Sequence, residues 1–188
     1  MPRPLAEREQ RDEYLNDVHV ADDAVGVLRA GFRSRGLDAR TLYVVFGDHG
    51  EAFREHEGNV AHALFLYEEN VHVPLFFALP GGGLPSRRTH ALASLLDLAP
   101  STLDLAGLAV PESHEGRSLA RGGSPAVRFF TEQGVRRAGL RAGRHKFLLD
   151  EDTGRAQLFD LDADPAERRD LAAAHPDLLA RYRACLGR

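Results

Sequence analysis

The apolar positions near the start of the chain follow a helical spacing. Between residues 5 and 35 they recur every three or four residues, which gathers them on one face of a single long amphipathic helix. Gly36 comes next, and glycine readily adopts the left-handed conformation that ends many helices. We therefore expect one helix from about residue 5 to the residues before Gly36. Its apolar stripe consists of Tyr14, Val18, Ala21, Val25, Leu28 and Phe32.

Two later runs are apolar without alternation. Residues 41–46 and 73–79 are mainly apolar and β-branched, a pattern typical of strands that are covered on both faces. Such strands occur mostly in parallel sheets with helices on both sides. A helical or loop crossover that includes residues 61–69 separates the two runs. Together they predict an α/β layered fold with helices on a mainly parallel sheet.

Two further helices are indicated. Residues 91–105 are helical in pattern, and Pro100 suits the first position of a new helix that Gly107 closes. A last helix is expected to begin at Pro176 and to run to about Leu186.

After Gly116 the pattern changes to short apolar segments separated by turn residues, which predicts an antiparallel meander. We therefore divide the chain into residues 1–120, part of an α/β domain, and residues 121–188, a small antiparallel subdomain with a terminal helix. The expected short strands lie at residues 127–130, 139–141, 146–149 and 157–159.

Composition excludes several classes of protein. With 24 basic and 28 acidic side chains, the net charge is −4, so no basic footprint indicates nucleic-acid binding. No apolar run reaches the roughly 18 residues that a membrane span requires. Cys185 is the only cysteine, which excludes an internal disulfide. The start, Met1-Pro2-Arg3-Pro4, leads into residues too polar for a secretory signal, so the chain as it stands is expected to be cytoplasmic, while the compartment of the complete enzyme stays open.

Candidate chemistry follows the first apolar run. Ligands of open α/β sheets bind beyond the carboxyl ends of the strands, and Asp48 and His49 occupy that position. A carboxylate and an imidazole can share one divalent cation, and Gly47 and Gly50 let the backbone turn sharply around them. The simpler interpretation, in which Asp48 caps a helix and His49 is an incidental loop residue, applies to most isolated Asp-His dipeptides.

Several short motifs follow one another along the chain. They lie at residues 47–51, 55–56, 62, 66–69, 71–75, 94–107, 116–119, 158–161 and 164–167. In this order they resemble motifs of the sulfatase family of the alkaline-phosphatase superfamily, including its S-D-H-G-E, L-Y-E-E, R-V-P-L and D-P-x-E patterns. The resemblance extends from about Tyr14 to the end of the chain. It implies an alkaline-phosphatase-like sandwich and the hydrolysis of sulfuric esters.

The resemblance also implies roles for individual residues. Asp48 and His49 match the second pair of metal ligands, with Ca²⁺ as the expected ion and Mn²⁺ or Zn²⁺ as alternatives. His62 matches a catalytic residue that contacts the oxygens of the sulfate or phosphate group, the alternative being an ordinary histidine on a helix surface. Glu55 and His56 are expected to be solvated charges, although they would also suit a role in orienting the metal ligands.

One part of the family pattern does not occur in these 188 residues. Sulfatases attack the ester with a formylglycine made from Cys or Ser in a C/S-x-P-x-R motif, near an Asp-Asp pair that supplies the first two metal ligands. No such motif is found here, and Asp22 and Asp23 lie within the expected first helix. By resemblance, the chain corresponds to the back half of a sulfatase. The nucleophile would lie in an N-terminal half, and we expect the chain to be inactive alone.

Three hypotheses on function stay open. The first is a sulfuric ester hydrolase represented by its C-terminal portion, with sulfate or phosphate esters as substrates of the complete enzyme. The second is a non-catalytic remnant or complementing half that binds a partner chain. It rests on the expectation that residues 41–46 present an uncovered edge or face when the front strands are absent. The third is a phosphate or phosphonate monoester hydrolase, or a phosphoglycerol transferase.

Overall fold

The computed structural model describes residues 5–187, with side chains from residue 9 onward. The first four residues, which entered the expectation of no secretory signal, lie outside this range. The elements are α1 (Leu5–Ser34), η1 (Asp38–Arg40), β1 (Tyr43–Phe46), β2 (Ala52–Phe53), β3 (Val60–Ala61), α2 (Glu68–Val71), β4 (Leu75–Ala78), η2 (Leu95–Asp97), α3 (Leu98–Leu105), η3 (Leu119–Arg121), β5 (Ala126–Thr131), β6 (Arg137–Ala142), β7 (His145–Asp150), β8 (Ala156–Asp160) and α4 (Pro176–Leu186).

The long first helix is confirmed. Gly36 ends it with φ of 69°, and the Leu37 N–H donates to the Phe32 carbonyl at 2.9 Å, the arrangement expected of a glycine-terminated helix. Phe32 packs edge-on against Tyr43 at the C-terminal end of the helix, with 6.2 Å between the ring centroids. Much of the apolar stripe nevertheless stays exposed, including Leu28 at 55%. The helix therefore presents an apolar face that the described part of the chain covers only in places.

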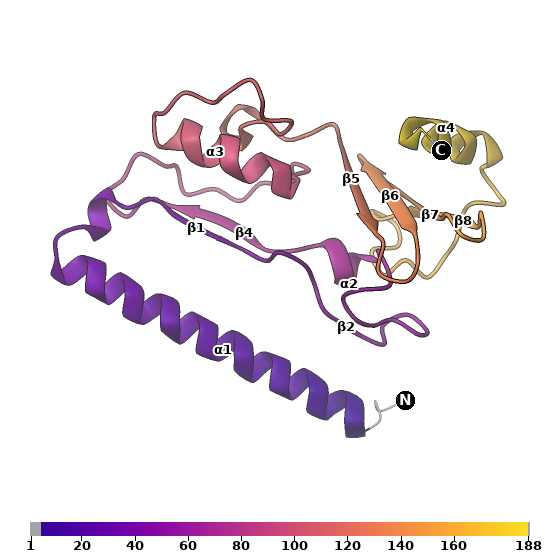
Figure 1. Cartoon of the computed structure of the whole chain (residues 1–188), viewed down its shortest axis with the longest axis horizontal. Helices are drawn as coiled ribbons and strands as arrows, with labels where there is room; N and C mark the ends of the chain where they lie inside the picture. Colours follow the sequence, from indigo (N-terminus) through magenta and orange to yellow (C-terminus); the bar gives the residue numbers. More distant parts are fainter. Residues whose placement is uncertain (1–4, 188) are drawn as a thin grey trace.

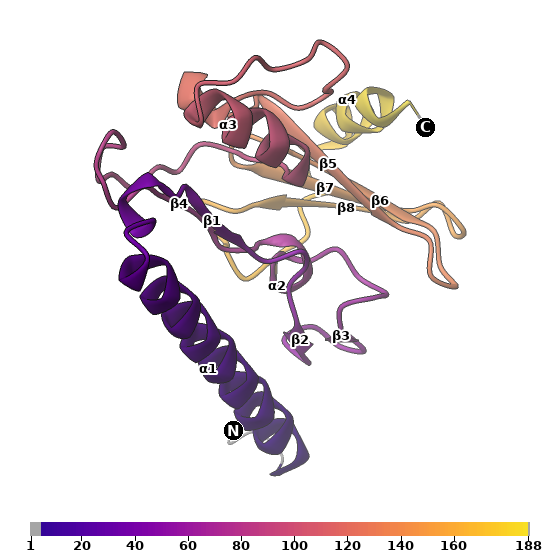
Figure 2. The same ribbon diagram turned by 60° about the vertical axis from the view of Figure 1, so that its left-hand side comes forward.

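The two apolar runs form the strands β1 and β4, and these pair with each other. They are antiparallel, with Tyr43 opposite Ala78 and Phe46 opposite Leu75, so the parallel pairing expected for them is wrong. Their connection contains the β2–β3 hairpin and one turn of helix in place of a crossover helix. Within the described residues neither strand is covered on both faces as expected, because Phe46 of β1 is 46% exposed and Phe76 of β4 62%. A continuous apolar run does not report strand direction either, and antiparallel edge strands are common in otherwise parallel sheets. Both views place α1 on one side of this pair and α3 on the other (Figures 1 and 2).

The third helix begins later than its pattern suggested. The helical turn starts at Leu95, because Ser94 and Asp97 form a capping box there, and it continues into α3. Pro100 is therefore the third residue of α3 and does not open a separate helix, whereas Gly107, with φ of 74°, closes α3 as expected.

The C-terminal sheet is the antiparallel meander that was expected. Its strands lie in the order β5-β6-β7-β8, and α4 begins at Pro176. Phe147 and Leu158 are fully buried and Phe159 is 1% exposed, while Tyr182 of α4 stacks on Phe147. The mixed α/β class with a small antiparallel sheet and a terminal helix is confirmed. The domain boundary at residue 120 stays a prediction.

A buried ionic cluster joins α2 to this sheet. The Lys146 Nζ lies 2.9 Å from Glu68 Oε1 and 3.0 Å from Glu167 Oε1, and the Lys146 side chain is fully buried. Burial raises the pKa of Glu167, and the charge of Lys146 opposes this shift. Leu66 adds an apolar contact, because it belongs to the same buried cluster as Leu148 and Phe159. The segment before α2 is thus anchored in the core of the C-terminal sheet.

Candidate functional site

The loop after β1 brings Asp48 and His49 within reach of one ion. Asp48 Oδ1 accepts the His49 N–H at 3.0 Å and lies 3.8 Å from His49 Nε2. Metal–ligand bonds of about 2.0–2.5 Å place two ligand atoms of one ion at roughly this separation. The Nδ1 of His49 lies 3.0 Å from the carbonyl oxygen of Gly50. A proton on Nδ1 would leave Nε2 as the ligand atom.

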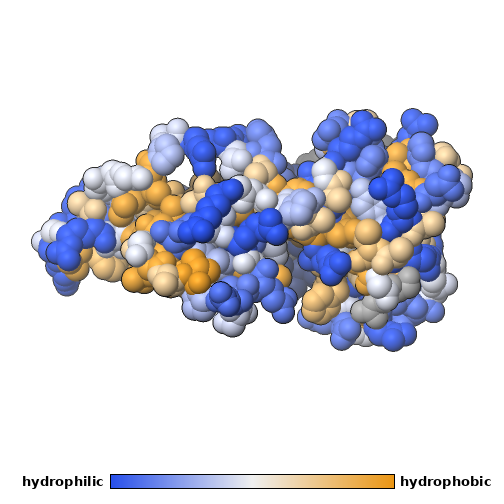
Figure 3. Space-filling view, turned by 90° about the horizontal axis from the view of Figure 1, so that it is seen from above, coloured by the Kyte–Doolittle hydropathy of each residue, from blue (hydrophilic) through white to orange (hydrophobic). Residues whose placement is uncertain are grey.

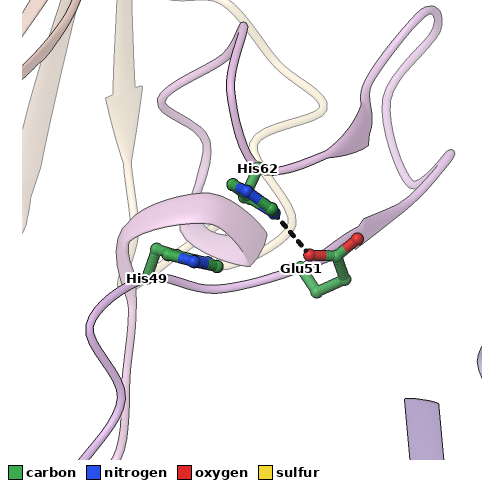
Figure 4. A group of neighbouring side chains, drawn as sticks. All are labelled: His49, Glu51 and His62. Carbon is green, nitrogen blue, oxygen red and sulfur yellow. Dashed lines mark hydrogen bonds and ion pairs between the residues drawn. The ribbon is translucent and has the colours of Figure 1, made fainter.

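The β2–β3 hairpin brings His62 to the same place. Ala52 pairs with Ala61, so Glu51 and His62 lie opposite each other one residue beyond the pair. The Nδ1 of His62 is 2.8 Å from Glu51 Oε2, and its ring stacks on that of His49 with centroids 3.9 Å apart (Figure 4). His62 follows a strand in a loop, so the interpretation as a helix-surface histidine is wrong.

Glu51 is the residue to which the sequence analysis gave no role. One ligand atom from each of His49, Glu51 and His62 falls within 4.8 Å of the other two. The sequence signal was present, because Glu51 closes the Asp-His-Gly-Glu run. Its meaning depends on the hairpin register, which the sequence does not show. The structure thus offers two overlapping donor sets, Asp48 with His49 and the His-Glu-His cluster.

These donors fit a divalent cation. Imidazole nitrogens suit zinc, and carboxylates suit calcium, magnesium and manganese. The side chains are open to solvent: Asp48 is 82% exposed, His49 46% and His62 44%. Because water screens the charges of an open site, these groups would act more strongly under a cover that excludes solvent.

Glu55 and His56 are not the solvated charges that the sequence suggested. The Phe53 N–H donates to Glu55. The Nδ1 of His56 lies 2.7 Å from Glu69 Oε1, and the His56 side chain is only 12% exposed. The His56 ring stacks on that of Tyr67, with the two centroids 3.7 Å apart. Its other nitrogen lies 3.2 Å from the Glu167 carbonyl oxygen, a partner 111 residues away that no local pattern reveals. Both residues therefore help to hold the loop in place.

The fold is that of the alkaline-phosphatase-like class. The sulfatase family matches residues 2–108, more than half of the chain. The chain belongs to the sulfatase family. Sulfatases act on sulfate esters and generally use a divalent metal, and the His49, Glu51 and His62 cluster is of a suitable kind.

Named relatives support this assignment. The Delta 4,5-hexuronate-2-O-sulfatase of Bacteroides thetaiotaomicron is 32% identical in a match that covers 89% of this chain and 38% of the relative. Arylsulfatase K of Xenopus laevis is 28% identical in a match that covers 93% of this chain and 36% of the relative. The chain therefore spans well under half the length of these relatives.

Solved structures agree on the fold. A 2-O GAG sulfatase superposes with a TM-score of 0.78 at 29% identity, over 89% of this chain and 40% of that one. The phosphonate monoester hydrolase of Silicibacter pomeroyi superposes with a TM-score of 0.73 at 24% identity, over 88% and 37%. The second likeness shows the fold alone.

Among the described residues, no helix is long and apolar enough to cross a membrane.

Proposed function

We propose that this chain carries the second metal-ligand pair and a substrate-contacting histidine of a sulfuric ester hydrolase. Asp48 and His49 would hold the divalent cation, with Ca²⁺ as the first candidate and Mn²⁺ or Zn²⁺ as the others. His62 would contact the group that is transferred. The convergence of His49 and His62, with Glu51 directly against His62, is the observation that supports this proposal.

The chemistry of the residues follows from their geometry. A cation at Asp48 and His49 would neutralise negative charge on the ester oxygens. When the His62 ring is protonated, its Nδ1–H donates to Glu51 and its Nε2–H is free to donate to an ester oxygen. Such a donor stabilises the charge that grows on that oxygen as the ester bond breaks. The Glu51 carboxylate orients the ring in the way that carboxylates orient metal-binding histidines.

We further propose that the chain needs a complementing part for turnover. The C/S-x-P-x-R motif does not occur among the residues of this chain. The chain matches only 38% of the length of the hexuronate sulfatase. The nucleophile, a formylglycine, and the first ligand pair would come from that other part. By analogy with the 2-O-sulfatases it resembles, the substrate class would be a sulfate ester on an acidic sugar.

An assay in trans tests this function. The chain alone is expected to show no turnover of aryl sulfates, aryl phosphates or sulfated uronides with Ca²⁺, Mn²⁺ or Zn²⁺ added. Co-expression with the part of the hexuronate sulfatase that lies outside the match should restore sulfate release. His49→Ala should abolish this activity, whereas His90→Ala, at an exposed histidine outside the site, should leave it unchanged. Turnover by the chain alone would disprove the half-site, and a preference for aryl phosphate would favour the phosphate or phosphonate monoesterase.

A non-catalytic binding role is the second candidate, and the exposed strand faces favour it. Phe46 and Val45 of β1 are 46% and 42% exposed, and Phe76 of β4 is 62% exposed. Uncovered apolar strands of this kind mark sites of association. Tight binding of the complementing part without any sulfate release would favour this role over the enzymatic one.

A further inference from the structure

Asn70 touches both sides of the loop that carries the site. It lies in α2 and is 4% exposed. Its backbone carbonyl accepts the Gly50 N–H at 2.8 Å, and its side-chain Nδ2 donates to the Ala61 carbonyl at 3.1 Å. Gly50 separates His49 from Glu51, and Ala61 directly precedes His62. One buried residue therefore contacts the backbone beside each member of the His-Glu-His cluster.

The backbone at both contact points needs such support. Ala61 has φ of 62°, a left-handed conformation that is unfavourable for a residue with a Cβ. At Gly50 the backbone lies so close to the backbone of Glu69 that a Cβ added to Gly50 would lie 2.0 Å from the Glu69 carbonyl oxygen. Left-handed alanines persist only where the surroundings hold them. At Ala61 the hydrogen bond from the Asn70 side chain to the Ala61 carbonyl helps to hold this conformation.

The orientation of the Asn70 amide is fixed by its own neighbour. Asn59 is fully buried, and its Nδ2 donates to Glu69 Oε1 at 2.8 Å and to Asn70 Oδ1 at 2.7 Å. Because both protons of Asn59 are used on acceptors, the oxygen of Asn70 faces Asn59. Its amino group is thereby directed to the Ala61 carbonyl, with a longer contact of 3.3 Å to Asn59 Oδ1.

We propose that Asn70 is a positioning residue that sets the relative placement of His49, Glu51 and His62. The proposal rests on the proposed function, since the side chains it positions are those assigned to the metal and the ester. The Asn70 side chain acts through the backbone at Ala61, whereas its backbone carbonyl, which any residue at this position would supply, holds Gly50.

The test uses Asn70→Asp, which keeps the shape of the side chain but places a carboxylate against the Ala61 carbonyl. Asn70→Ser, too short to reach Ala61, serves if the first variant does not fold. Asp97→Asn is the matched control. Asp97 is 1% exposed, and its carboxylate accepts hydrogen bonds only from within residues 94–124, so its loss lowers stability away from the site.

Two measurements on the full chain separate the positioning role of Asn70 from the proposed metal site. In metal-free protein, nuclear Overhauser cross-peaks between the His49 and His62 rings report their stacking. They should be present in the wild type and in Asp97→Asn, and lost in a folded Asn70 variant. Calorimetric titration with Zn²⁺ should show affinity at least about tenfold weaker for the Asn70 variant, the loss typical of disturbed supporting groups.

The outcomes are distinct for the two ideas. Cross-peaks that persist in a folded Asn70 variant would overturn the positioning role, whatever the zinc result. A wild-type chain that keeps its cross-peaks and binds no Zn²⁺ would count against a zinc site built from His49, Glu51 and His62 alone, and the positioning role would stand. Equal loss of the cross-peaks in Asp97→Asn would show that general destabilisation is the cause, and this result too would overturn the role of Asn70.

Discussion

The two ends of this molecule bury their apolar residues very differently. In the C-terminal sheet, Phe147 and Leu158 are inaccessible to solvent, and α4 covers the sheet face that they occupy. In the N-terminal layer, Phe76 is 62% exposed and Leu28 55% exposed. Figure 3 shows hydrophobic residues at the surface of both halves, so the contrast lies in the exposed fractions of these individual side chains.

This contrast teaches where the fold is complete within the chain. A sheet that buries its own core can be stable alone, whereas a two-stranded pair is marginal without further strands or layers. The site loop lies between the two regions, and Leu66, Glu68 and His56 tie it to the C-terminal side. We therefore expect the loop to depend on the complete region for its shape and on a complementing part for its cover.

The largest effect is expected in the complete core. Phe147→Ala should lower the free energy of unfolding by about 3–5 kcal/mol, the usual cost of emptying a buried aromatic site. Phe130→Ala is the matched control, because Phe130 belongs to the same sheet but is 75% exposed; it should change stability by no more than about 0.5 kcal/mol. Urea denaturation followed by circular dichroism measures both. Equal losses would contradict the contrast in burial.

The ionic cluster between the regions should come next. Lys146→Ala would remove the cation that lies between Glu68 and Glu167, although Arg141 would still pair with Glu68 at 3.3 Å. Breaking a buried pair in this way costs about 3 kcal/mol or more. Because Glu68 belongs to α2 and Glu167 to the C-terminal part, the two regions should also begin to unfold separately. Hydrogen exchange would show this as lost protection in residues 47–72 before β6–β8. Arg136→Ala, which removes an exposed ion pair with Asp152, should produce no such separation.

Sequence reasoning succeeded where the pattern is local. The periodic stripe predicted α1, and the short apolar segments separated by turn residues predicted the meander. The metal-binding role of Asp48 and His49, inferred from their position after an apolar run, stays a prediction. Sequence reasoning failed where the answer depends on pairing. The antiparallel direction of β1 and β4 and the role of Glu51 are set by strand register. The burial of His56 depends on Glu167, 111 residues away, and nothing in the composition of the loop predicts that contact.

Acid should act on the C-terminal region through Asp150. The Thr153 side chain and backbone, and then Arg137, hold the pKa of this carboxyl below its ordinary value, which is about 3.9. A lowered carboxyl pKa adds stability at pH above that value, and this stability is lost as the pH falls through the folded pKa. Asp150→Asn should therefore lower the Tm at pH 6, with a difference that shrinks below about pH 3.9. Asp162→Asn, which removes a carboxylate from an exposed turn of the same region, is the control, and an equal loss of Tm at pH 6 in this variant would contradict the role of Asp150.

The smallest change in stability is expected on the uncovered strand pair. Phe76→Glu should alter the free energy of unfolding by at most about 0.5 kcal/mol, because the side chain is already mostly in water. It should nevertheless reduce self-association of the chain and weaken binding of the complementing part, since a charge on an apolar strand face opposes docking. Phe130→Glu, at a side chain that is more exposed still (75%) but lies on the complete sheet, should leave both properties unchanged. Sedimentation velocity over a range of concentrations measures the association. If both substitutions act alike, exposure of aromatic side chains in general would explain the effect, and β1 and β4 would have no special part in it.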